Sequence, residues 1–229
     1  MAVISEILRM VTSLIGRLVN SNAVKNDLNF NNMNDRYKKI KDLLYKFEKY
    51  GVKRLENGAV LIGHPDYLSE HRWINEIYAP LNEHDIEVLE KECNTSIPDD
   101  YKFFLKNFAN GINVLSDCFS LDGLRKELGR TKDASRQPYA LKIPNVMERF
   151  LVGNTKESYF FIGGYSFDGS LVYIDKETDK VHFCKDYDAT PLYTWNSLED
   201  MLFSEITRIY TLFTEDGRKI DENRSTLPI

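Results

Sequence analysis

Four short β-prone runs follow one another between residues 150 and 186, and they constrain the fold more than any other feature of this chain. The runs read FLVGNT, SYFFIGG, GSLVYID and KVHFCKD, and turn-forming residues such as Asn154, Gly169 and the segment KETD separate them. This spacing is typical of strands that reverse direction at each turn. The sequence therefore predicts an antiparallel β-meander.

Helices are predicted before and after this meander in the sequence. Asn82 is a good helix cap, and Pro98 is suited to begin a second helix that ends near Gly111. After the meander, Ser197 caps a closing helix whose apolar positions continue to about residue 213. Together these elements predict an α+β domain over residues 80–213, with helices packed on an antiparallel sheet.

Residues 112–150 are less regular. The run VLSDCFSL favours a strand, and LDGLRKELG allows a short helix with a glycine interruption. Pro138 and Pro144 then break any longer element.

Residues 1–79 are predicted to be an N-terminal extension that begins with a helix. Residues 1–19 repeat apolar side chains at helical spacing, and the helix is expected to dock on the body of the protein or on a second copy in a homodimer. A membrane-surface helix is the alternative. A signal peptide and a transmembrane span are not expected, because Glu6, Arg9 and Arg17 interrupt the apolar run.

The rest of the extension reads as linker, helix and hairpin. Residues 20–35 contain seven asparagines and no apolar period, which indicates a linker. Residues 35–50 recover helical period and end at Gly51, and Asn57-Gly58 then predicts a hairpin with a type I′ turn. The last sixteen residues, 214–229, are predicted to be a polar tail.

The charge balance argues against a generic nucleic-acid binder. The 229-residue chain has 30 Lys and Arg against 35 Asp and Glu, a net charge of −5, whereas such binders are usually basic. Cys93, Cys118 and Cys184 cannot all pair internally and lack metal-type spacing. They favour a reducing compartment, so a cytoplasmic protein is expected.

No arrangement of residues predicts catalysis, a metal or a cofactor. The chain lacks GxSxG, Walker, HExxH and CxxC motifs. His182 and Cys184 share one face of a strand, but nothing supplies an oxyanion site for such a pair. The remaining histidines and the acids of one turn also lack ligand spacing, and they are His64, His71, His84, Asp175, Glu177 and Asp179. An enzyme acting on a small molecule is therefore only a minority hypothesis.

Three patches, in order, carry a resemblance to a known family. They are IPDDYK running through FL to Asn110-Gly111, then FIGG followed by DGSLVY, and finally WNSLEDML. In this order they resemble the SUKH superfamily, the Smi–Knr type that includes bacterial immunity proteins and yeast cell-wall regulators. Residues 1–79 have no counterpart in the short members of that superfamily.

The resemblance implies a non-catalytic protein that binds a protein partner. One hypothesis is an immunity protein that neutralises a cognate bacterial toxin, and a nuclease-type toxin with a basic surface would suit the acidic chain. The other hypothesis is a regulatory scaffold of the yeast type. Neither hypothesis includes a nucleic-acid partner.

The expected binding face combines two loops. The resemblance implies use of the sheet face that helices leave uncovered, together with loops at its edge. Such loops here hold aromatic residues beside acids, and the candidates are Tyr165, Phe167, Asp168, Asp186, Tyr187 and Asp188. The alternative is that the aromatics are partly buried loop plugs and that the acids are simply solvated.

Overall fold

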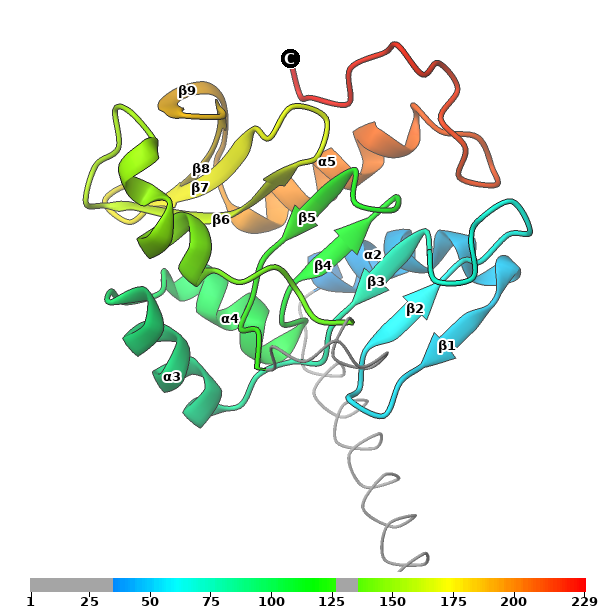
Figure 1. The fold of residues 1–229 in the computed structure, drawn as a ribbon, viewed down its shortest axis with the longest axis horizontal. Helices are drawn as coiled ribbons and strands as arrows, with labels where there is room; N and C mark the ends of the chain where they lie inside the picture. Colours follow the sequence, from blue (N-terminus) through cyan, green and yellow to red (C-terminus); the bar gives the residue numbers. More distant parts are fainter. Residues whose placement is uncertain (1–34, 127–135) are drawn as a thin grey trace, which may run out of the picture.

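The computed structural model describes residues 35–126 and 136–229 as one nine-stranded antiparallel sheet with helices packed on it (Figure 1). The strands lie in the sheet in the same order as in the sequence. They are β1 (Val52–Arg54), β2 (Val60–Ile62), β3 (Asn75–Ile77), β4 (Ile112–Val114), β5 (Phe119–Leu121), β6 (Tyr159–Tyr165), β7 (Leu171–Asp175), β8 (Lys180–Lys185) and β9 (Asp188–Trp195). The predicted α+β fold is confirmed.

Seven helical segments complete the described part of the chain. They are α2 (Asp35–Leu44), η1 (Tyr45–Tyr50), α3 (Glu83–Cys93), α4 (Asp99–Asn107), η2 (Ile143–Met147), η3 (Arg149–Leu151) and α5 (Leu198–Tyr210). In Figure 1, α2 and α5 lie behind the strands β1 to β5, and no helix of the described residues covers the near face of those strands. The main hydrophobic cluster lies on the helix-covered side.

The predicted helix ends agree with the structure where local hydrogen bonds decide them. The Asn82 side chain accepts from the amide of Asp85, whose carboxylate accepts from the amide of Asn82 in return. Ser197 likewise accepts from the amide of Asp200. Pro98 is the residue before the first turn of α4 rather than a member of it.

The predicted strand VLSDCFSL is wrong, because the run forms a hairpin. Leu115, Ser116 and Asp117 all have positive φ and reverse the chain between β4 and β5. The described residues of the next run, 121–126, are not helical.

The first predicted strand of the meander, FLVGNT, is also wrong. Residues 149–151 form the short helix η3 instead. The Arg149 side chain fixes this turn by donating to the carbonyl oxygens of Tyr159 at 2.8 Å and Lys156 at 2.5 Å. Val152 then packs into a second apolar cluster on the other face of the sheet, with Phe161 and Tyr173 among its members.

Strand β9 was not predicted. It pairs with β8 after a two-residue turn of Asp186 and Tyr187, so KVHFCKD is not the last strand. Pro191 lies within β9, and proline is tolerated there because β9 forms an edge of the sheet.

The hairpin of β1 and β2 is confirmed, but its turn is not type I′. Gly58 has a φ of 84°, whereas Asn57 is not among the residues with positive φ. Asn57 instead uses its side-chain oxygen to accept from the amide of Ala59 at 3.1 Å. The predicted helix over residues 35–50 is also confirmed, and Gly51 ends it with a φ of 106°.

The sheet runs without a break across residue 79. Strand β3 pairs with β4, and the main cluster combines Ile40 and Phe47 with Phe104 and Ile206. The predicted division into residues 1–79, 80–213 and 214–229 stays a prediction. The helix of residues 1–19, its homodimer and membrane-surface alternatives, and the linker up to residue 34 lie outside the described residues.

Several residues of the predicted tail contact the domain. Arg208 of α5 donates to the carbonyl oxygen of Thr226 at 2.6 Å, and Leu227 packs against the main cluster. In the two described ranges, every helix is too short or too polar to cross a membrane.

Candidate protein-binding surface

The two predicted loops lie next to each other in space. The loop of residues 166–170 joins β6 to β7, and the turn at 186–187 joins β8 to β9. A Cβ atom added to Gly169 would lie 3.3 Å from a carboxylate oxygen of Asp186. Partial burial and the charge of Asp168 raise the pKa of Asp186. We call Phe167, Asp168, Asp186, Tyr187 and Asp188 the two-loop patch.

The aromatic residues of the two-loop patch are open to solvent. Phe167 is 49% exposed and Tyr187 is 62% exposed. Tyr187 has a φ of 60°, because it occupies the tight turn between β8 and β9. The Tyr187 ring is therefore accessible to a partner, and so is the part of the Phe167 ring that Lys219, whose ammonium lies 5.5 Å from the ring centroid, leaves open.

The acids of the patch also shape the turns. The Asp168 carboxylate accepts from the amide of Ser170 at 2.9 Å and from its hydroxyl. Asp188 accepts from the side-chain amide of Asn154 and from the backbone amide of Thr190, both at 2.9 Å. These two bonds lower the pKa of Asp188, so its charge is maintained at neutral pH.

The expectation that Tyr165 is exposed is wrong. The residue ends β6 with its side chain on the helix-covered face and is 3% exposed. Its ring lies 5.1 Å from that of Phe119 and 5.4 Å from that of Phe183. Phe160 and Ile162 of β6 face the same core, so unbroken alternation would direct Tyr165 to the opposite face. The β-bulge between Phe161 and Gly163 shifts the alternation and places Tyr165 in the core.

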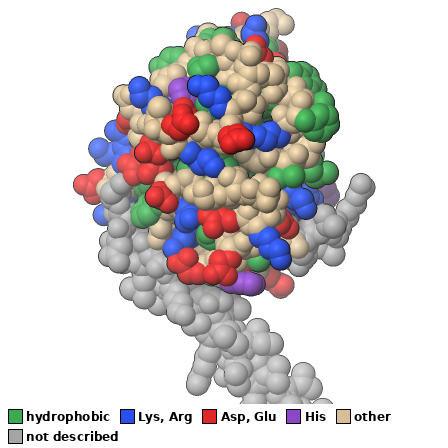
Figure 2. Space-filling view, turned by 90° about the vertical axis from the view of Figure 1, so that its left-hand side faces the viewer, with side chains coloured by type: hydrophobic (Ala, Val, Ile, Leu, Met, Phe, Trp, Pro, Cys, Tyr) green, Lys and Arg blue, Asp and Glu red, His purple; other side chains and the backbone are tan. Residues whose placement is uncertain are grey.

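An exposed apolar segment adjoins the two-loop patch, and the sequence analysis did not find it. Its members, which we call the apolar segment, are Val146, Met147, Phe150 and Leu151. Phe150 is 81% exposed. The helices η2 and η3 lie at the left in Figure 1, and Figure 2, which views that side, shows hydrophobic side chains gathered at the upper right edge. Helical spacing between residues 147, 150 and 151 was the available signal, but a strand was predicted over part of this run.

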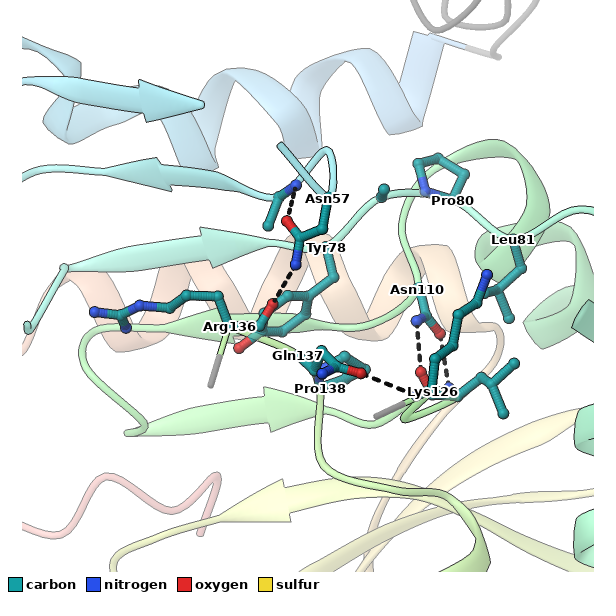
Figure 3. A pocket seen from close by; sticks show the side chains of 12 residues that line it. Asn57, Tyr78, Pro80, Leu81, Asn110, Lys126, Arg136, Gln137 and Pro138 are labelled. Carbon is teal, nitrogen blue, oxygen red and sulfur yellow. Dashed lines mark hydrogen bonds between the residues drawn. The ribbon is translucent and has the colours of Figure 1, made fainter. Parts of the chain in front are cut away.

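A separate pocket of about 180 Å³ lies between the β1–β2 turn and residues 136–138 (Figure 3). Its two cations are already paired. The Lys126 ammonium lies 2.8 Å from Asp85, and the Arg136 guanidinium lies 2.5 Å from Glu76. Asn110 is also engaged with the backbone of Leu124 in both directions. These contacts give the pocket a structural role.

The His182 and Cys184 pair has the predicted shared face but no suitable chemistry. Burial raises the pKa of the Cys184 thiol to about 12, which keeps it protonated at neutral pH. Nδ1 of His182 lies 2.8 Å from the hydroxyl of Thr194, and burial lowers the pKa of this imidazole.

The other candidate ligands are also engaged in local structure. His64 bonds to the carbonyl of Arg72 at 2.7 Å, and the amide of Asp179 donates to the carbonyl of Asp175 at 2.8 Å, closing the turn between β7 and β8. Across residues 35–126 and 136–229, no three His, Cys, Asp or Glu side chains are grouped as a metal site requires.

The comparison with protein families identifies the domain that carries this surface. The model of the SMI1 / KNR4 family (SUKH-1) matches residues 80–204, which is more than half of the 229 residues. The match begins just before α3 and ends within α5, so it includes the two-loop patch and the apolar segment. No curated protein matches the sequence. The chain belongs to the SMI1 / KNR4 family (SUKH-1).

Proposed function

We propose that this chain is a cytoplasmic immunity protein that binds a cognate bacterial toxin and neutralises it by protein–protein contact. Its superfamily includes immunity proteins. The observation that carries the proposal is a continuous surface made of exposed aromatic and aliphatic side chains beside clustered acids. A toxin of the nuclease type would offer the complementary basic surface.

The proposal depends on how the binding free energy of an interface is distributed among its residues. A few large side chains supply most of the affinity of an interface. Here Phe150, Phe167 and Tyr187 are exposed and can act as such anchors. Charged side chains at the rim mainly speed association with an oppositely charged partner. Asp168 and Asp186 occupy such positions in the two-loop patch.

The experiment is a charge reversal tested against the cognate toxin that the proposal requires. We expect D168K/D186K to lose protection in co-expression and to bind the toxin more slowly and with less salt dependence. Asp188 is left intact because it also links its turn to the distant Asn154. The Asp168 bonds run only to Ser170 within its own loop, so their loss should leave the rest of the fold unchanged. Protection by the folded double variant at the wild-type level would contradict the role of the two-loop patch.

A matched control changes two acids elsewhere on the same sheet. Glu157 and Glu177 are exposed near the start of β6 and the end of β7, at the opposite ends of these strands from the patch. E157K/E177K makes the same change in net charge and is expected to protect fully. If the wild-type protein itself gives no protection, the immunity role fails, and the regulatory scaffold becomes the better hypothesis for the same surface.

A further inference from the structure

A cleft of about 290 Å³ opens beside the two-loop patch and contains a buried acid. Its floor is backbone at Gly163 and Gly164 in β6, where a β-bulge shifts the register against β7. A side chain at either glycine would collide with a neighbouring carbonyl oxygen, at 2.1 Å for Gly163 and 2.2 Å for Gly164. The walls are largely apolar and include Ile143, Pro144 and Leu171.

The buried acid is Asp122, the residue after β5. Leu121 faces the helix-covered core, so the alternation along the strand directs Asp122 to the opposite face, where it lines the cleft. The residue is 7% exposed. Its backbone groups bond to Ile162 and Tyr101, but within the described part of the chain no donor is bonded to its carboxylate.

The described charged residues that line the cleft all have the same sign. Asp117 and Glu148 line it together with Asp122, and none of the lining residues in the described ranges is a lysine, arginine or histidine. Asp117 accepts from the side chains of Asn113 and Tyr139. Within the part of the chain that the structure describes, Asp122 therefore has acids, and no base, beside it in the cleft. Burial raises its pKa to about 7.

We propose that this cleft binds the cationic side chain of an arginine or lysine presented by the protein partner, with Asp122 as its buried counter-ion. The identity of that partner rests on the proposed function. A carboxylate buried without a partner is unfavourable, and a cation that enters the cleft removes this cost. The apolar walls suit the aliphatic part of the side chain, and the rim acids Asp117 and Glu148 attract its charge.

The position of the cleft fits a partner held on the neighbouring surface. Ser166 and Gly169 line the cleft and belong to the loop that carries Phe167 and Asp168. Ile143 and Glu148 line it from the other side and adjoin the apolar segment. A toxin seated on both surfaces would have the mouth of the cleft between its contacts.

The test uses the full chain and a small probe, so it does not need the toxin. N-acetyl-arginine N-methylamide is titrated into isotope-labelled protein and followed by the NMR amide signals of Gly163, Gly164 and Ser170. The matched probe is the citrulline analogue, which has a similar shape but no charge. We expect saturable shifts with the arginine probe only. D122N should weaken its binding at least tenfold, whereas E177Q, a change to an exposed acid, should not alter it.

One more variant and one more probe complete the titration experiment. E148Q changes an exposed rim acid and should weaken binding two- to fivefold, so the test survives if D122N does not fold. Spermidine is the third probe, and binding of spermidine tenfold tighter than the arginine probe would assign the cleft to a free amine and overturn the proposal.

Equal binding of the citrulline probe, or unchanged binding by folded D122N, would also overturn it. If the arginine probe binds as expected but the toxin experiment fails, the cation site stands and only the immunity role is lost.

Discussion

The amide nitrogen of Gly153 donates to the carbonyl oxygen of Tyr187 over 2.8 Å, and the amide of Ala189 donates back to Gly153 at the same distance. This short parallel bridge attaches the end of η3 to the turn between β8 and β9. It makes one continuous surface of the apolar segment and the two-loop patch, although about 35 residues separate them in the sequence. Backbone bonds, rather than the exposed aromatic rings, join the two segments, so Phe150 and Tyr187 can be changed without unfolding the protein.

Truncating the exposed anchors should therefore weaken binding without affecting stability. We expect F150S and Y187S each to reduce affinity for the toxin by about 2 kcal/mol or more, because large aromatic residues dominate interfaces. The free energy of unfolding should change by less than about 0.5 kcal/mol, as is usual for exposed sites. Calorimetric titration and urea denaturation measure the two quantities. V52S removes another exposed apolar side chain, in β1 at the opposite edge of the sheet from β9, and should leave affinity unchanged.

The buried carboxyl of Asp122 should make stability depend on pH in a specific direction. Its pKa is about 7 in the folded protein against an ordinary value of 3.8. Between these values the folded protein keeps a proton that the unfolded chain has lost, so the free energy of unfolding falls as pH rises from about 4 to 7. The lining acids Asp117 and Glu148 and the Tyr139 hydroxyl face the same cleft, and none is a cation that would reverse this direction.

The D122N variant should not show this fall in the free energy of unfolding as pH rises. Relative to wild type, its stability should gain on the order of 4 kcal/mol between pH 4 and pH 8, which is the pKa difference converted to free energy. Urea denaturation at a series of pH values measures the difference, and E177Q is the control for an exposed acid. Parallel wild-type and D122N curves would show that the Asp122 carboxyl titrates normally.

Asn75 should be among the most sensitive polar positions in the protein. Its side chain donates to the carbonyl of Leu44 at 2.8 Å and to the hydroxyl of Tyr210 at 2.7 Å, and it accepts from the amide of Leu115 at 3.1 Å. We expect N75A to cost about 3 kcal/mol or more, since it leaves several buried groups unsatisfied. N196A, at an exposed asparagine, should cost almost nothing. A single cooperative loss of stability would show that residues before and after 79 unfold together.

The glycines beneath the cleft should not accept a side chain. An added Cβ at Gly163 would lie 2.1 Å from the carbonyl oxygen of Ser120, so G163A must separate β5 from β6. We expect a loss of at least 2–3 kcal/mol in thermal or urea unfolding, in the range of severe backbone clashes. The comparison is G153A, whose nearest contact would be an ordinary 3.4 Å. Equal stabilities of the two variants would contradict the close strand packing.

The local elements could be predicted from the sequence wherever neighbouring residues decide them. Asn82 and Ser197 cap helices through atoms three residues away, and the runs of β6, β7 and β8 alternate between two buried faces. The neighbour order of β6, β7 and β8 also followed from the short turns between them, whereas long segments join β3 to β4 and β5 to β6. The family resemblance was confirmed by the match over residues 80–204.

Only the tertiary structure decided where exposed and buried groups meet. Residues 150–152 are apolar and β-prone, but Arg149 bonds to two carbonyl groups further along the chain and holds residues 149–151 in a helical turn. Strand alternation directs Asp122 away from the core and into the cleft, whereas the β-bulge in β6 turns Tyr165 into the core. No local pattern in the sequence reveals this bulge. The sequence by itself determined the capped helices and the strands β6 to β8, because short-range bonds and side-chain period specify them. Contacts between distant segments decided the surface and the cleft, because these depend on how the strands register against one another.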